Sequence, residues 1–362
     1  MNSPLFVKTS PQRILVITLR FLGDTLLTTP LINSLKKAYP DAEIDVLIYQ
    51  NNAAILEGNP AISKLISTVT KPNSHDNKRL FKQIFRRYDL AVCTQTGDRP
   101  TLYAFLAAPV RIGLVPPRNQ KGWFKRYLFQ RYLEFDVVKT HTVLELLRLC
   151  QLLAIDSVYE LTPPSSTDNS VLSQFEISDR YVVMHIMPQW RYKQWTDEGW
   201  IAVANYFAQQ GFQILLSGSP VAKEVNYLTE IQKQFPNNTV NLAGKLSLAQ
   251  LAQVIKDSRL FIGPDTGITH LAAATGVKTI ALFGPSDPVK WTPWPTAYHS
   301  NTPPFASKGS QHVNNVYLIQ GQKECVPCYL EGCDRHQQSY SACLDAVTFE
   351  QVKETINHAL NE

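Results

Sequence analysis

The sequence of 362 residues lacks any uninterrupted apolar run of about 18 residues, the length that a membrane-spanning helix needs. Its first residues, MNSPLFVKTSPQR, contain no apolar segment typical of a secretory signal. We therefore expect a cytoplasmic protein. With 44% apolar residues, a chain of this length can build two cores, so we expect two domains.

Several common motifs are also missing. No G-x-G-x-x-G follows a predicted strand and no G-x-x-x-x-G-K-[ST] occurs, which argues against a dinucleotide fingerprint and a P-loop. The G-x-S-x-G elbow of many hydrolases is absent. There is no D-x-D either, which weakens the case for a metal-bridged nucleotide-sugar site. Diphosphate binding without a metal or other cofactor remains open.

Cysteine is scarce, and six residues in a chain of this length do not make a disulfide scaffold. Cys93 and Cys150 lie in apolar segments typical of a core. The other four form a C-x2-C-x4-C-x9-C pattern, namely Cys325, Cys328, Cys333 and Cys343. A structural zinc site and free or redox-labile thiols are both compatible with this spacing.

What the chain does have is a regular alternation of short β-rich runs and helical segments. In the first half the predicted strands are at 13–18, 43–49 and 89–94, and the helices near 25–38, 79–88 and 142–154. A polar, Pro-rich linker at 161–170 precedes a second series, with strands at 181–186, 212–218, 260–262 and 278–284 and helices between them. This alternation predicts an α/β protein with parallel, doubly wound sheets.

We expect an N-terminal domain at residues 1–165 and a C-terminal domain at 171–345. A final helix at 346–362 is expected to return towards the N-terminal domain. Residues 285–340 are predicted to be loop-like. Ligands of doubly wound sheets bind beyond the carboxyl ends of the strands, so we expect a cleft between the two domains there.

Asp24 follows the first predicted strand, within LGDTLLTTP. As a general base its carboxylate could take the proton of an attacking hydroxyl. It could equally be the N-cap of a helix that begins at Thr25. The spacing alone does not separate these interpretations.

Three strand-end turns of the second half carry further candidates. Arg191 and Lys193 lie in an aromatic-rich loop, where an ammonium could neutralise a departing diphosphate or could simply be solvated. Glu224 could accept bonds from ribose hydroxyls or be an ordinary acid at a helix start. The turn DTGITH suits an anion nest before a helix. Its His270 could bind an oxygen atom or belong to the core.

These segments together resemble the glycosyltransferase family 9 heptosyltransferases, which build the inner core of bacterial lipopolysaccharide. The resemblance covers about residues 13–45 and 181–294 and is most specific in DTGITH and in the turn GPSDP. It implies a GT-B fold, with the acceptor on the first domain and the ADP-sugar on the second. It also implies inversion at the anomeric carbon without a metal.

The resemblance assigns roles to matching residues. Asp24 matches the base and Lys193 the lysine that contacts the phosphates. Donor-binding positions are matched by Glu224, Leu246, Asp265, Thr266, Gly267 and His270. The sequence departs from the family pattern before Lys193, where Met187, Pro188, Gln189 and Trp190 replace small residues. That departure leaves open another nucleotide-activated sugar as donor.

Basic residues gather in the first half. Between residues 99 and 133 there are seven Lys or Arg and no Asp or Glu. The candidates for binding an anionic acceptor are Arg79, Arg86, Arg118, Lys121, Lys125 and Arg126. We expect a lipid-linked lipopolysaccharide core as acceptor and peripheral contact with the cytoplasmic face of the inner membrane, although a solvated basic face remains an alternative. No nucleic-acid-binding module accompanies the patch, so nucleic acid is not an expected partner.

The alternative to a transferase is a protein of another functional class, a non-catalytic nucleotide-sugar binding protein.

Overall fold

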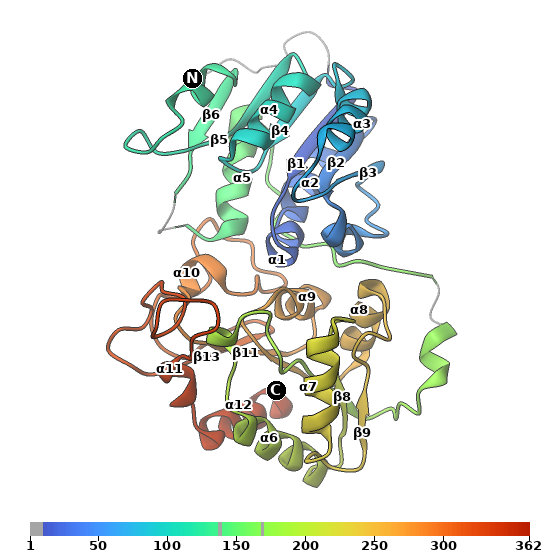
Figure 1. Ribbon diagram of the computed structural model, residues 1–362, viewed down its shortest axis with the longest axis vertical. Coiled ribbons are helices and arrows are strands. Elements are labelled where there is room, and N and C mark those ends of the chain that lie inside the picture. The colour runs from blue at the N-terminus through green and yellow to red at the C-terminus, as the bar shows by residue number, and fades with distance from the viewer. Residues whose placement is uncertain (1–9, 137–139, 168–169) are drawn as a thin grey trace. The chain divides into compact units, whose positions relative to one another are not determined.

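The computed structural model describes residues 10–136, 140–167 and 170–362. The chain forms two compact units, Met1–Thr162 (unit 1) and Pro163–Glu362 (unit 2). Each unit is an α/β structure built on one sheet, as Figure 1 shows. No helix within the described ranges combines the length and apolarity required to span a bilayer.

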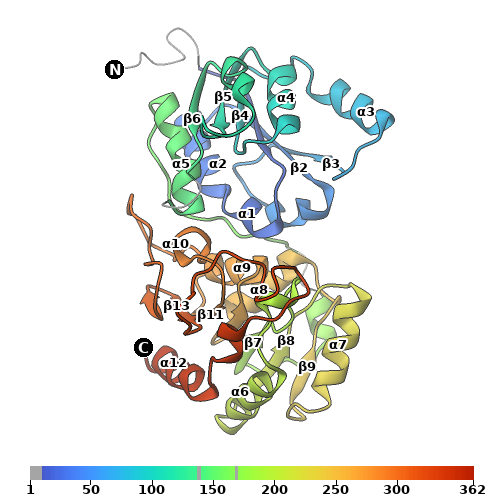
Figure 2. The same cartoon turned by 60° about the vertical axis from the view of Figure 1, so that its left-hand side comes forward.

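Unit 1 has a six-stranded sheet in the order β3-β2-β1-β4-β5-β6, in which all neighbours are parallel. Its strands are β1 Arg13–Thr18, β2 Glu43–Tyr49, β3 Lys64–Thr68, β4 Leu90–Cys93, β5 Val110–Val115 and β6 Arg131–Glu134. Its helices are α1 Leu22–Leu26, α2 Thr29–Ala38, α3 Ser74–Ile84, α4 Asp98–Ala107 and α5 Thr142–Leu153, with 3₁₀ turns η1 Gln50–Leu56 and η2 Trp123–Tyr127. Helices α3 and α4 cover one face of the sheet, and α2 and α5 cover the other (Figure 2). Burial on both faces explains the continuous apolar run ILVI in β1.

The helix predicted near 25–38 is two helices. Helix α1 ends at Leu26, and α2 begins at Thr29 with Pro30 in its first turn. Proline has no N–H and its ring clashes with the carbonyl four residues earlier, so Pro30 cannot continue α1 but can start a new helix. The break sets α1 apart as a short helix directly after the first strand.

Unit 2 has a seven-stranded sheet in the order β12-β13-β11-β10-β7-β8-β9, parallel except for the edge pair β12 and β13. Its strands are β7 Tyr181–Met184, β8 Gln213–Leu216, β9 Thr239–Asn241, β10 Phe261–Pro264, β11 Thr279–Phe283, β12 Gln311–Val313 and β13 Val316–Gln320. Its helices are α6 Asp197–Gln209, α7 Ala222–Gln232, α8 Leu248–Asp257, α9 Gly267–Thr275, α10 Pro288–Trp291, α11 Ala342–Asp345 and α12 Phe349–Asn361, with 3₁₀ turns η3 Ser170–Gln174 and η4 Arg191–Lys193.

The expectation that residues 285–340 are entirely loop-like is wrong. The segment contains α10, β12 and the fully buried strand β13, whose run VYLIQ pairs with β11. Five residues are too short a run to distinguish from a loop without knowledge of the neighbouring strand. Helix α12 buries Val352, Ile356 and Ala359 in the core beside α6 and α7, and α8 and α9 pack on the opposite core of the same sheet.

Candidate functional site

The candidate site of unit 2 lies at the carboxyl ends of three neighbouring strands of its sheet. Strands β10, β7 and β8 are adjacent and parallel, so the turns that follow them lie side by side at the carboxyl ends of the strands. These are the three turns that the sequence analysis singled out. The unit therefore brings the predicted donor-binding segments together.

Lys193 and Asp265 lie far apart in the sequence and form an ion pair. The ammonium nitrogen of Lys193 is 2.6 Å from Oδ2 of Asp265. Lys193 ends η4, the turn after β7, and Asp265 directly follows β10. The side chains are only 16% and 6% exposed, respectively, so solvent screens their attraction weakly. The pair ties two of the strand-end turns together.

Two aromatic rings flank the Lys193 ammonium. Its nitrogen is 5.6 Å from the centroid of the Trp190 ring and 5.9 Å from that of Tyr192. The two rings stack, with centroids 5.9 Å apart and planes inclined by 10°. A cation near ring faces gains electrostatic attraction, so the rings help to define where the ammonium points. Trp195, by contrast, is a core residue whose indole N–H donates to the carbonyl of Val347.

The turn after β10 is built as the start of α9. Thr266 is the N-cap: its backbone is extended and its hydroxyl accepts the N–H of Thr269 at 3.4 Å. Amides of the first helical turn have no partner within the helix and are available to an anion. Thr266 and Gly267 are half-buried, whereas His270 is buried. The two residues that open the helix are thus more accessible to a ligand than the histidine.

Leu246 is half-buried and packs against the core cluster of α8 and α9, as does Ile268 of α9. It lies in the segment between β9 and α8. The structure therefore places this predicted donor-binding residue against the same core as α9, the helix that follows the DTGITH turn.

His185 is a buried residue at these strand ends that the sequence analysis did not name. Its Nδ1 lies 3.1 Å from the hydroxyl and 3.2 Å from the carbonyl oxygen of Ser217. Burial lowers the pKa of the imidazole, which the nearby Glu224 carboxylate and the Ser217 carbonyl partly offset. The hydroxyl of Ser219 donates to Oε2 of Glu224. Glu224 is therefore part of a polar network. The sequence signal that could have identified His185 is its position directly after the apolar run YVVM.

In unit 1, Asp24 lies inside α1 and its carboxylate Oδ1 is 3.2 Å from Nη2 of Arg20. The N-cap of α1 is Phe21, which makes no side-chain cap bond. The interpretation of Asp24 as an N-cap is therefore wrong, because the carboxylate lies in the first turn, where it interacts favourably with the helix dipole. The side chain is 8% exposed. Arg20, which the sequence analysis did not name, holds the carboxylate in place.

The six predicted anion-binding residues differ in their exposure to solvent. Those at the surface are Arg79, Arg86, Arg118 and Lys121. Lys125 is only 5% exposed, and its ammonium contacts Asp98 Oδ1 at 2.6 Å and the carbonyl of Thr96 at 2.5 Å. Arg126 bonds to Glu134 Oε1 at 3.1 Å. Folding thus supplies acidic partners from just outside the acid-free stretch 99–133.

Large aromatic side chains project from η2 beside these cations. Trp123 is 67% exposed and Tyr127 80% exposed, with their rings edge to face at a centroid distance of 5.9 Å. Phe124 is also exposed. Exposed tryptophan and tyrosine next to lysine and arginine are typical of surfaces that meet a membrane interface.

The four cysteines of the C-terminal segment are free thiols in the structure. Burial raises the pKa of Cys343 to about 11, with smaller contributions from Cys328 and Cys333. Among the described residues, three or more potential metal ligands come together only at His312, His358 and Glu362, so the cysteines do not form such a group.

Comparisons with known proteins agree with this architecture. The model of glycosyltransferase family 9 (heptosyltransferase) matches residues 77–316. Lipopolysaccharide heptosyltransferase 3 of Escherichia coli is 33% identical over 293 residues, which cover 76% of this chain and 84% of that protein. The structure of E. coli ADP-heptose lps heptosyltransferase II superimposes with a TM-score of 0.73 at 22% identity, covering 96% of this chain and 98% of the other. E. coli WaaC with ADP-2-deoxy-2-fluoro heptose gives 0.69 at 18% identity, covering 96% and 99%.

Proposed function

The chain belongs to glycosyltransferase family 9, the heptosyltransferase family, with the GT-B fold of two Rossmann-like units, and we propose that it transfers heptose from ADP-heptose to the inner core of lipopolysaccharide. The names of its relatives support the acceptor class, and the WaaC complex with an ADP-heptose analogue supports the donor. In this proposal unit 2 binds the donor and unit 1 supplies the base.

The Lys193–Asp265 pair is the observation that carries the donor assignment. In the structure the ammonium is neutralised by one carboxylate, and a diphosphate with more negative charge would compete for it. Asp265 would then keep the turn between β10 and α9 in position. Lys193 and the amides of Thr266 and Gly267 would bind the phosphate oxygens. Glu224 would accept bonds from ribose hydroxyls and Leu246 would face the adenine.

The reaction is a single displacement with inversion. Asp24 takes the proton from an acceptor hydroxyl, whose oxygen forms a bond to the anomeric carbon. The bond from that carbon to the diphosphate breaks, and ADP leaves with the electron pair. Lys193 stabilises the negative charge that grows on the diphosphate. Such a cation takes the place that a metal ion has in D-x-D sites, so the proposal is metal-independent.

Trp190 favours a second candidate donor. It occupies a position where a small residue is expected from the family pattern, and it stacks with Tyr192 beside Lys193. A ring there changes the space next to the phosphates, so a different nucleotide-activated sugar is the alternative. A panel of nucleotide sugars separates the two donors.

The acceptor side is proposed to meet the cytoplasmic face of the inner membrane through η2. Trp123, Phe124 and Tyr127 would enter the headgroup region while Arg118 and Lys121 face anionic lipid. The test is sedimentation with vesicles that contain anionic lipid, using wild type and a W123S/Y127S variant. Binding that is unchanged in the variant would remove η2 from the proposal.

The activity is tested by measuring ADP release from ADP-heptose with truncated lipopolysaccharide cores of increasing length. Release that requires one core length supports the proposed transferase and identifies its acceptor. ADP binding without release for any core or sugar donor would instead support a non-catalytic nucleotide-sugar binding protein.

A further inference from the structure

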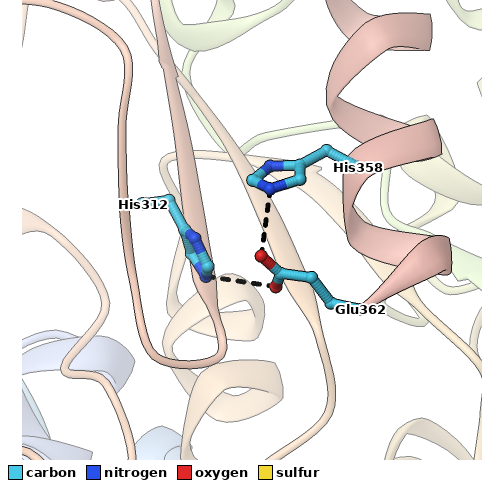
Figure 3. A group of neighbouring side chains, drawn as sticks. All are labelled: His312, His358 and Glu362. Atoms are coloured by element: carbon cyan, nitrogen blue, oxygen red, sulfur yellow. Dashed lines mark ion pairs between the residues drawn. The ribbon is translucent and has the colours of Figure 1, made fainter.

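Three potential metal ligands meet on unit 2 at the edge strand β12 and the end of α12. His312 belongs to β12, His358 to α12, and Glu362 follows the end of α12. Figure 3 shows both imidazole rings directed at the same carboxylate. His358 Nε2 is 3.0 Å from Glu362 Oε1, and His312 Nε2 is 3.8 Å from Oε2.

From this geometry we propose that His312, His358 and Glu362 bind a divalent transition-metal ion of the zinc class. Two ligand atoms bonded to one tetrahedral zinc stand roughly 3.3 to 3.5 Å apart, because zinc bonds to nitrogen and oxygen are about 2.0 to 2.2 Å long. The two measured separations lie on either side of that value, and the three ligand atoms all lie within 4.8 Å of one another. Small side-chain movements would suffice, with water completing the shell.

Tyr317 of β13 touches all three ligands and pre-orients them. Its ring stacks on His312 at a centroid distance of 4.0 Å with planes inclined by 7°, and it meets the ring of His358 edge to face at 5.7 Å. Its hydroxyl donates to Oε2 of Glu362. Tyr317 itself is almost completely buried, so it gives the exposed ligands a rigid support. Such outer contacts fix the orientation of metal ligands and raise affinity.

The ligand chemistry selects the class of ion. Two imidazoles and one carboxylate suit zinc, nickel or cobalt rather than magnesium or calcium, which prefer all-oxygen shells.

Two interactions oppose metal binding. His312 Nε2 is 2.6 Å from the carbonyl oxygen of Asn314 and must give up this contact to become a ligand. The Lys278 ammonium, which donates to the carbonyl of Ala359 at 2.7 Å, adds a nearby positive charge. A bound ion would fasten the end of α12 to the β12–β13 edge of the sheet.

The test is thermal unfolding of the full chain with and without zinc at about pH 7.5, followed by chelation with EDTA. At zinc concentrations about a hundredfold above the dissociation constant, we expect the Tm of unit 2 to rise by roughly 5 °C or more, and to return on chelation. The H312Q/H358Q and E362Q variants should lose the shift. H75Q, which changes an exposed histidine of unit 1, is the matched control and should keep it.

Cobalt provides an independent measurement, because cobalt bound to thiolate gives an intense near-ultraviolet charge-transfer band that imidazole and carboxylate do not give. The proposal expects cobalt binding without that band. No metal-dependent shift in wild type would overturn it. So would a shift that persists in H312Q/H358Q, or a thiolate band, which would move the metal to the cysteines at 325–343.

Discussion

Two ion pairs, one in each unit, contrast in how the fold makes them. Arg20–Asp24 in unit 1 joins residues four positions apart at the start of α1, whereas Lys193–Asp265 in unit 2 joins turns that follow different strands. Both hold a carboxylate that is less than a tenth exposed. The local pair needs only α1 and the two residues before it to form correctly, but the long-range pair needs the correct strand order of the whole sheet. We therefore expect changes in the second pair to affect both stability and activity.

The largest expected effect comes from the base of the local pair. Asp24→Asn keeps the shape of the side chain but removes the proton acceptor, so kcat should fall roughly 10²- to 10⁴-fold. The affinity for ADP-heptose should change little, because the proposal assigns donor binding to unit 2. Steady-state ADP release and donor titration measure the two quantities separately. Asp41→Asn, at an exposed position of the same unit, is the control; near-normal turnover in Asp24→Asn would remove the base assignment.

The cation of the long-range pair comes next. Lys193→Met removes the charge that stabilises the departing diphosphate, and kcat should fall roughly 10²- to 10³-fold. Lys193→Arg should retain part of the rate, since it keeps the charge but changes its geometry. A Lys193→Met protein that loses only donor affinity, with kcat unchanged, would show that the lysine binds the ground state and transition state equally.

The contrast between the local pair Arg20–Asp24 and the long-range pair Lys193–Asp265 also explains which features could be predicted from the sequence. The βαβ alternation, the family and the strand-end turns depend on local patterns, so RILVIT, DLAVCT and FIGPDTG were recognisable without the structure. The pairing of Lys193 with Asp265 depends on β7 and β10 being neighbours, which no local pattern reveals. Similarly, Lys125 lies in an acid-free stretch, yet it is buried against Asp98 once α4 is placed.

Small elements were the hardest to predict. Strand β13 has five residues and is recognisable only through its pairing with β11. His185 and Arg20 were missed because each acts through a partner, Ser217 or Asp24, that the fold brings close. The assignments of individual site residues stay predictions until the variants are measured.

Removing each partner of the long-range pair in turn should reveal an asymmetry in stability. Lys193→Met leaves the buried Asp265 carboxylate unpaired and should cost about 2 to 3 kcal/mol of unfolding free energy. Asp265→Asn leaves a lysine whose long side chain can turn towards water, so the cost should be about 1 kcal/mol. Urea unfolding followed by tryptophan fluorescence reports mainly on unit 2, which contains five of the six tryptophans.

The double variant Lys193→Met/Asp265→Asn completes the comparison. It should be more stable than the sum of the single changes predicts, because no uncompensated charge remains. Equal costs for the two single variants and strict additivity in the double variant would mean that the pair contributes no coupling energy.

The smallest effect is the pH dependence that His185 should give to the stability of unit 2. Burial lowers the pKa of His185, so the unfolded chain binds a proton at a higher pH than the folded unit does. The stability of unit 2 should therefore fall as the pH drops below the unfolded pKa of about 6.5, by up to about 1 kcal/mol between about pH 7.5 and about pH 5.5. His185→Asn can still donate to the Ser217 carbonyl but does not titrate, so this part of the pH dependence should disappear. His75→Asn changes an exposed histidine of unit 1 and should leave it intact. Identical pH profiles for wild type and His185→Asn would mean that other groups account for the acid sensitivity of the unit.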